Sequence, residues 1–120
     1  MKILANQEKG IAFVREEEII ICDVQSALDL MATIWHEYGC NAMIINKVAI
    51  IEEFFDLSTR LAGEIVQKYV NYGMKLAIIG DFSGYSSKSL QDYIYECNKG
   101  KDIFFVKNEE EATKLILKGI

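Results

Sequence analysis

Short apolar runs separated by polar residues dominate the N-terminal part of the chain, a pattern that predicts strands rather than helices. Residues 3–6 and 11–15 flank the tetrapeptide Gln-Glu-Lys-Gly, which is typical of a hairpin loop. Residues 16–18 are three glutamates and suit an exposed turn, after which residues 19–22 resume an extended chain. We therefore expect an antiparallel hairpin at the N-terminus.

Four later segments carry apolar residues at helical spacing. Each is preceded by a side chain that caps helices well, and three are followed by a glycine, which can adopt the left-handed conformation that ends a helix. The expected N-caps are Asp23, Ser58, Ser86 or Ser87, and Asn108, and the expected terminating glycines are Gly39, Gly73 and Gly100.

Continuous apolar runs between these helices predict buried strands at residues 42–45, 48–51, 76–79 and 103–106. Strands that alternate with helices are typical of a parallel sheet. The expected fold is therefore α/β in a single domain over residues 1–120, with a mixed, mostly parallel sheet of about five strands, an N-terminal antiparallel hairpin and four helices. The pattern leaves open whether the helices cover both faces of the sheet or mainly one.

Composition narrows the possible partners. The chain has 120 residues, of which 51% are hydrophobic and 26% charged, as in ordinary folded proteins. Its net charge of −5 is unfavourable for binding a phosphate backbone or an anionic membrane. We expect another protein, or a second copy of the chain in a homo-oligomer, as the partner, and neither nucleic acid nor a membrane.

Three cysteines without a CxxC pair do not suggest a disulfide framework. The first residues lack the long apolar segment of a signal peptide, and the longest apolar runs are much too short to span a membrane. These features predict a reduced, cytoplasmic protein.

The carboxyl ends of parallel strands are where ligands collect in open α/β sheets. Here residues 51–58 and 80–87 each lead from a predicted strand into a helix and place an acid and hydroxyls near the positive end of the helix dipole. This arrangement predicts an anion site or a phospho-acceptor at Ser58 or Thr59. The alternative is that the serines act only as helix caps.

A functional crevice is predicted around the same two segments. Arg60 and Lys68 would hold an anionic ligand there, with Asp81 or Glu64 as a base; alternatively, the i, i+4 spacing of Arg60, Glu64 and Lys68 describes an ordinary solvated helix face. The candidate crevice residues are Asp56, Arg60, Glu64, Lys68, Asp81, Ser83, Ser86 and Asn98.

Other chemistry finds little support in the sequence. The glycines of residues 80–84 do not form a GxGxxG loop, and no glycine precedes Lys88 at the P-loop spacing. His36, Cys40 and Cys22 are nominal zinc ligands, but Gly39 interrupts them and free thiols are common in protein cores. We expect no cofactor and no metal. Tyr72, Tyr85 and Tyr95 lie near loops or polar faces and suggest a partner-binding patch.

Two longer stretches resemble a known family. The patterns FFDL, AGE, QK and NY within residues 54–72, and GD followed by ExNxG within residues 80–100, are similar to the bacterial domain-of-unknown-function family 4180. The order of elements is also similar to that of STAS domains, the anti-sigma-factor antagonist fold. That similarity implies a regulatory switch with a phospho-acceptor serine after the central strand, where Asp56, Ser58 and Gly63 stand here.

Two functional hypotheses follow. The first is a non-enzymatic protein-interaction or regulatory module. The second is a small ligand-binding or enzymatic domain that uses the crevice at the carboxyl ends of the strands. Self-assembly through the edge of the N-terminal hairpin is a further possibility.

Overall fold

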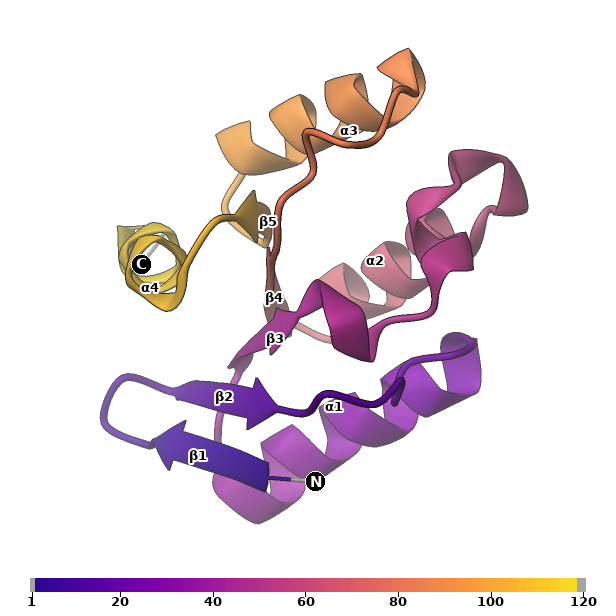
Figure 1. Cartoon of the computed structure of the whole chain (residues 1–120). Coiled ribbons are helices and arrows are strands. Elements are labelled where there is room, and N and C mark those ends of the chain that lie inside the picture. The colour runs from indigo at the N-terminus through magenta and orange to yellow at the C-terminus, as the bar shows by residue number, and fades with distance from the viewer. Residues whose placement is uncertain (1, 119–120) are drawn as a thin grey trace.

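The computed structural model describes residues 2–118 of the chain (Figure 1). The N-terminal hairpin consists of β1 (Lys2–Asn6) and β2 (Ile11–Arg15), which pair antiparallel with Leu4 opposite Phe13. Gly10 closes the loop with φ 72°, a conformation that favours glycine. The predicted hairpin is confirmed.

The rest of the described chain alternates helices and strands. In order these are α1 (Val24–Tyr38), β3 (Ala42–Asn46), α2 (Leu61–Asn71), β4 (Lys75–Ile79), α3 (Lys88–Lys99), β5 (Ile103–Val106) and α4 (Glu109–Lys118). The sheet has the order β1-β2-β3-β4-β5, and β2 to β5 are parallel. The expected α/β fold with a mostly parallel sheet is confirmed.

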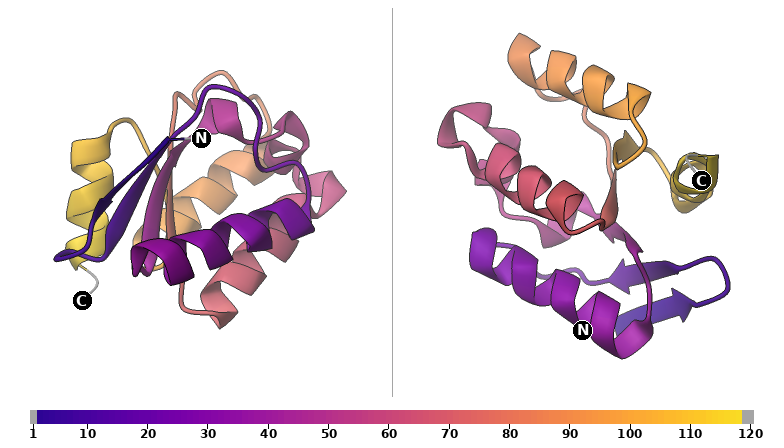
Figure 2. Two further views of the ribbon diagram at one scale, coloured as in Figure 1. Left: turned by 90° about the horizontal axis from the view of Figure 1, so that it is seen from below. Right: turned by 180° about the vertical axis from the view of Figure 1, so that it is seen from behind.

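The two faces of the sheet are covered unequally (Figure 2). The parallel strands β2 to β5 have the same order in the sheet as in the sequence. Right-handed crossovers between such strands place the connecting helices on one face of the sheet. That face packs against α1, α2 and α3 and forms the larger core, whereas α4 alone packs against the other face through Ala112 and Ile116. Because α4 follows the last strand, no crossover fixes its side. The sequence pattern left open how the helices divide between the faces: three cover one face, and α4 covers the other.

Most predicted helix ends are confirmed. The Asp23 carboxylate accepts a hydrogen bond from the Ser26 backbone in a capping box, and Gly39 ends α1 with φ 64°. Ser87, rather than Ser86, caps α3. Asn108 accepts a hydrogen bond from the Glu111 backbone at the start of α4.

Residues 48–51 do not form the predicted strand. The Asn46 side chain accepts a hydrogen bond from the Val48 backbone at 3.2 Å and turns the chain into a short 3-10 helix, η1 (Lys47–Ala49). This local bond competes with strand pairing. Residues 19–22 likewise contribute only a single bridge, between Ile21 and Ile50.

Ser58 does not cap the second helix, contrary to the prediction. The chain first forms two 3-10 helices, η2 (Glu52–Phe55) and η3 (Leu57–Thr59), and Ser58 lies within the second. The residue before α2 is Arg60, which has φ 67° and makes no side-chain cap bond. The Asp56 carboxylate accounts for this difference, since it binds the Ser58 backbone and starts η3 at Leu57, ahead of α2.

The helices within residues 2–118 include none with the length and apolar character that crossing a membrane requires.

Candidate functional site

The carboxyl ends of β2 to β5 border a hollow made of two adjoining depressions, which we call the edge hollow. Asn46 and Ile79 line both depressions, whose volumes are about 690 and 960 Å³. The smaller is bordered by Arg15 and Glu109. The polar residues lining the larger one are Asn46, Asp81, Ser83, Gln91, Asn98, Lys107 and Glu111. The edge hollow occupies the place where open α/β sheets bind ligands.

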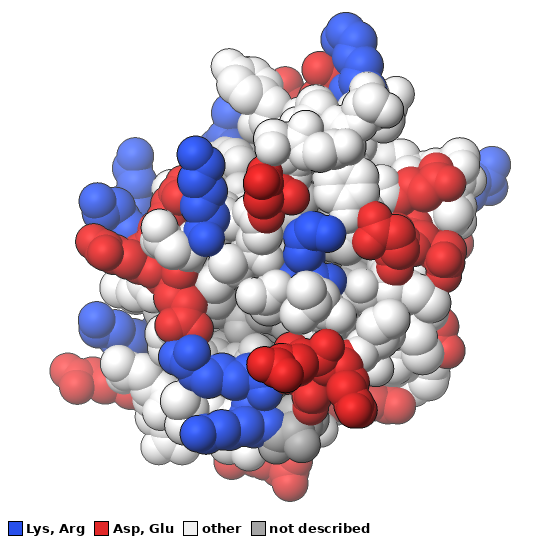
Figure 3. All heavy atoms as spheres, viewed as in Figure 1, with Lys and Arg blue, Asp and Glu red and all other residues white. Residues whose placement is uncertain are grey.

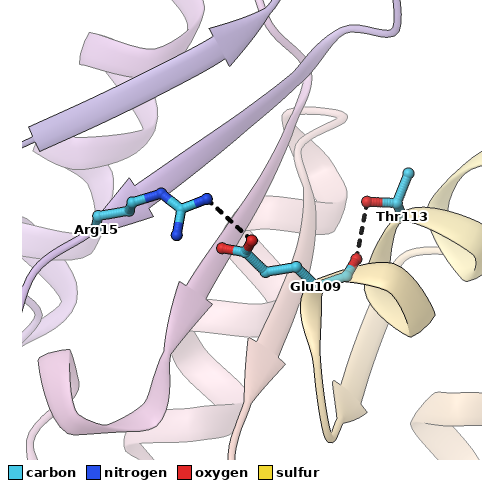
Figure 4. Close-up of polar contacts among 3 residues, drawn as sticks. All are labelled: Arg15, Glu109 and Thr113. Atoms are coloured by element: carbon cyan, nitrogen blue, oxygen red, sulfur yellow. Dashed lines mark hydrogen bonds and ion pairs between the residues drawn. The ribbon is translucent and has the colours of Figure 1, made fainter.

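An ion pair crosses the smaller depression (Figure 4). The Arg15 guanidinium, at the end of β2, lies 2.9 Å from the Glu109 carboxylate at the start of α4. It also lies over the Phe13 ring, 5.8 Å from the ring centre. The two side chains are 47% and 40% exposed, so the pair contributes at most about 1 kcal/mol to stability. Its main effect is to join the hairpin to α4.

A chain of hydrogen bonds lies beside the larger depression. The Lys47 ammonium donates to the Tyr85 hydroxyl at 2.9 Å, and that hydroxyl donates to the Glu52 carboxylate at 2.6 Å. The ammonium also lies 5.0 Å and 5.4 Å from the ring centres of Tyr85 and Phe55. The hydrogen bond to Tyr85 raises the pKa of Lys47, so this cation is firmly charged at neutral pH. Sequence reasoning missed it because nothing in the residue pattern predicts that η1 turns Lys47 toward the loop before α3.

Two aspartates adopt the same local turn. The carboxylate of Asp56 accepts from the Ser58 backbone at 3.1 Å and from the Ser58 hydroxyl at 2.6 Å. Asp81 accepts from Ser83 in the same way, at 3.0 Å and 2.6 Å. The serine hydroxyl and backbone lower the pKa of each aspartate, and Lys107 and Lys47 contribute further at Asp81. A carboxylate with a lowered pKa is a weak base, which argues against Asp81 as a proton acceptor.

The predicted crevice residues fall into two groups. Asp81, Ser83 and Asn98 come together in the edge hollow. Ser86 is exposed in the loop before α3 and is not among the residues that line the hollow. The remaining candidates lie outside the hollow, in the turn before α2 or on the exposed side of α2: Asp56, Ser58, Thr59, Arg60, Glu64 and Lys68.

Asn98 has a structural role within the hollow. Its amide group donates to the Phe105 carbonyl at 3.1 Å and accepts from the Phe105 backbone N–H at 2.8 Å. These are the bonds that a neighbouring strand would make, so Asn98 covers the outer edge of β5. Its amide is therefore committed to the backbone rather than free for a ligand.

The two candidate phospho-acceptors are both exposed and already hydrogen-bonded. Ser58 donates to Asp56, as described above, and the Thr59 hydroxyl lies 2.8 Å from the carbonyl oxygens of both Glu53 and Asp56. Thr59 also accepts from the Leu61 backbone at 3.3 Å. Of the two, Thr59 is nearer to α2: it ends η3, and through its hydroxyl it binds the backbone of Leu61, the first residue of α2.

The nominal zinc ligands are not brought together. Cys22 precedes α1 and Cys40 follows it, so the length of the helix separates them. Within residues 2–118 no group of three or more His, Cys, Asp or Glu side chains is arranged to hold a metal ion. All three cysteines are free thiols, and burial raises the pKa of Cys40 and Cys97.

The tyrosines expected to form one patch lie in three places. Tyr85 is engaged with Lys47 and Glu52, Tyr95 lies on α3 with the Lys99 ammonium 4.3 Å from its ring centre, and Tyr72 follows α2. Tyr72 and Tyr95 are strongly exposed.

A small apolar groove lies between the C-terminal ends of α1 and α2. Met31, Ala32, Trp35, His36 and Tyr72 line it, and its volume is about 330 Å³. Trp35 is 45% exposed and Tyr72 58%, which is unusual for side chains of this size. The sequence showed the apolar stripe of α1, but it did not show that Trp35 at one end of this stripe is exposed. We call this feature the Trp35 groove.

Charge is mixed on the face of the molecule that carries the labels in Figure 1. Figure 3 shows acidic and basic side chains interspersed on one face rather than a field of one sign. This face therefore gives no strong attraction for a polyanion.

Comparison with known families identifies the chain. Residues 6–116 match the model of the family described as Domain of unknown function (DUF4180). The match covers nearly the whole chain, and the chain therefore belongs to this family. No curated protein and no solved structure matches the chain.

Proposed function

We propose that this protein is a protein-interaction module that binds an apolar segment of another protein in the Trp35 groove. The observation that carries this proposal is the exposure of Trp35 and Tyr72 on either side of one apolar depression. Tryptophan and tyrosine are the residues most enriched at binding hot spots, because each offers a large apolar area and a polar edge.

The size of the groove sets the scale of the contact. A volume of about 330 Å³ is at the lower limit of ligand pockets and accommodates one or two inserted side chains. Met31 and Ala32 add apolar surface to the lining, and His36 adds a polar group. We expect a short amphipathic segment with one bulky apolar side chain as the anchor.

Trp35 makes a direct test possible, because it is the only tryptophan in the chain. A purified partner, recovered with the protein from its source cell, should shift the Trp35 fluorescence emission to shorter wavelength as water leaves the ring. Trp35→Glu should abolish binding, whereas Tyr95→Ser, which changes an exposed aromatic on α3, should retain it. Binding that survives Trp35→Glu would refute the proposal.

Regulation by phosphorylation at Ser58 or Thr59 is a further part of the proposal. A phosphate on Ser58 would replace the hydrogen bond to Asp56 with a contact between two anions and would open η3. Ser58→Glu should therefore change the affinity for the partner, whereas Ser58→Ala should change it little. Equal binding by both variants and the unmodified protein would rule out a switch at this residue.

A second candidate function is the binding of a small polar ligand in the edge hollow. The observation that favours it is the presence of Lys107, Asp81 and Asn46 around one depression at the carboxyl ends of the strands. Cations and anions side by side suit a small zwitterion. A thermal-shift screen with amino acids and small anions should then find a stabilising compound whose effect is lost in Lys107→Ala. Stabilisation that persists in Lys107→Ala would exclude this site.

A further inference from the structure

The two edges of the sheet differ in whether their backbone groups are paired. At β5, the Asn98 side chain binds both polar groups of Phe105, as described above. At the opposite end β1 is the last strand in the sheet order, and its one strand neighbour is β2. Four of its five residues are exposed. Within the described chain, β1 is therefore the open edge.

The hydrogen-bonding pattern identifies which groups of β1 are free. The Gly10 carbonyl accepts from the Ala42 backbone in β3, so the N–H of Ile11, on the other side of the same planar peptide, points toward β1. The direction of the backbone polar groups alternates along β2, so the N–H and C=O of Phe13 also point toward β1. Phe13 lies opposite Leu4, so the backbone N–H and C=O of Leu4 point toward β2. The backbone N–H and C=O groups of Ile3 and Ala5 consequently point outward.

We propose that β1 pairs antiparallel with β1 of a second copy, so that two copies form one continuous ten-stranded sheet around a two-fold axis at Leu4. In this register Ile3 of each copy lies opposite Ala5 of the other. The outward N–H and C=O groups of Ile3 and Ala5 in both copies then all form hydrogen bonds. Registers shifted by two residues place Ile3 or Ala5 opposite residues outside β1. The proposal uses a surface different from the Trp35 groove and does not depend on it.

Side chains favour the same register. Leu4 is 43% exposed and lies beside Phe13 on the sheet face that α4 covers only in part. The two-fold axis places Leu4 directly against Leu4 of the second copy in a non-hydrogen-bonded pair, where side chains approach most closely. The apolar strip would then run from Phe13 through both leucines to the second Phe13. Lys2, the only charged side chain of β1, lies opposite the neutral Asn6.

The covered edge at β5 limits the assembly to two copies. A sheet with two open edges would continue into a filament, whereas one open edge gives a closed, symmetric pair. Sedimentation equilibrium should therefore show a concentration-dependent mass that approaches twice 13.7 kDa and does not exceed it. A constant single-chain mass at the highest soluble concentration would overturn the proposal, and so would a trimer.

Charged substitutions of either sign at Leu4 test the position of the two-fold axis. Leu4→Lys and Leu4→Glu should each increase the dissociation constant about tenfold or more, because like charges then face each other across the axis. A mixture of the two variants should pair again, now as a heterodimer. Tyr95→Lys, an exposed change of the same kind on α3, should pair as the unmodified protein does. If both Leu4 variants remain paired, or if the mixture does not pair, the proposed axis is wrong.

Cross-linking provides a test that does not depend on affinity alone. In a Cys22→Ser background, which removes the exposed cysteine, Leu4→Cys should form a disulfide between copies rapidly, because non-hydrogen-bonded pairs bring Cα atoms to a suitable distance. Ala5→Cys on the same strand should cross-link much more slowly, since each Ala5 lies opposite Ile3 of the other copy. Equal rates, or a faster Ala5→Cys, would exclude this register.

Discussion

Gly80 is required by the path of the Lys47 side chain. A Cβ atom at Gly80 would lie 2.4 Å from Cδ and 2.8 Å from Cγ of Lys47, closer than carbon atoms can approach. In Gly80→Ala the lysine must therefore leave its place and lose its bond to Tyr85. We expect a loss of about 1–3 kcal/mol in the free energy of unfolding, measured by urea denaturation.

Two controls isolate this contact. Gly84→Ala, in the same loop, adds a Cβ that meets no atom within 4 Å and should leave stability nearly unchanged. In a Lys47→Ala background, Gly80→Ala should cost much less than it does alone, because the obstructing side chain is gone. A cost that is equal in both backgrounds would show that the backbone, and not Lys47, requires the glycine.

Tyr69 links α2 to α1 and adds a pH dependence to stability. Its side chain is fully buried, and its hydroxyl donates to the Ala27 carbonyl at 2.6 Å. Burial raises the pKa of Tyr69 above its ordinary value of 10.0, so above that pH the unfolded chain releases a proton that the folded chain retains. Stability should then fall as pH rises beyond 10.0, and this contribution is fully present at lower pH.

Tyr69→Phe should separate the two effects. Near neutral pH the variant should lose about 1 kcal/mol because the hydrogen bond to Ala27 is removed. Between pH 10 and 11, its stability should fall less steeply than that of the unmodified protein, by up to about 1.4 kcal/mol per pH unit. Urea denaturation across this range measures both. Parallel pH profiles would show that Tyr69 ionises equally in the folded and unfolded chain.

At the scale of elements, α3 protects the edge strand β5 through a single side chain. Asn98→Ala would leave the N–H and carbonyl of Phe105 without their partner, at a cost of about 1–3 kcal/mol. Hydrogen exchange of the Phe105 amide should accelerate, which NMR can follow. Ser89→Ala, an exposed change on the same helix, should alter neither quantity. Unchanged exchange in Asn98→Ala would mean that other contacts protect this edge.

The helices and strands also show what a residue pattern can and cannot predict. The alternation of apolar strands and amphipathic helices predicted the order of α1 to α4 and the mostly parallel sheet, because each of these elements buries one regular face. Residues 48–51 were wrongly predicted as a strand because an apolar run alone does not show that the Asn46 side chain binds the Val48 backbone. Ser58 was wrongly assigned as a cap for the same reason, since Asp56 binds its backbone first.

The candidate site was predictable only in part. The carboxyl ends of the strands follow from the fold, and Asp81 and Ser83 lie there as expected. Arg15 and Lys107 also stand at carboxyl ends of predicted strands, but their pattern does not show that Arg15 pairs with Glu109 of α4 or that Lys107 lines the hollow. Lys47 was missed because its position depends on η1, which the sequence did not predict. The Trp35 groove was missed because exposure at the end of an amphipathic helix cannot be distinguished from burial by spacing alone.

For the whole molecule, pairing through β1 couples stability to concentration. If two folded copies are linked, unfolding releases two chains, and each tenfold increase in protein concentration adds about 1.4 kcal/mol to the stability of the pair. With an unfolding entropy of about 0.5 kcal/mol/K for two chains of this length, the melting temperature should rise by about 3 °C per tenfold increase.

Leu4→Lys should remove this dependence without unfolding the chain, because Leu4 is nearly half exposed and contributes little to either core. Differential scanning calorimetry over a hundredfold range of concentration would then give superimposed curves for Leu4→Lys and a rising series for both Tyr95→Lys and the unmodified protein. Superimposed curves for all three would mean that the folded chain is a monomer and that the open edge at β1 is hydrated. The chain would then have to resist edge-to-edge association through the shortness of β1 and the charge of Lys2.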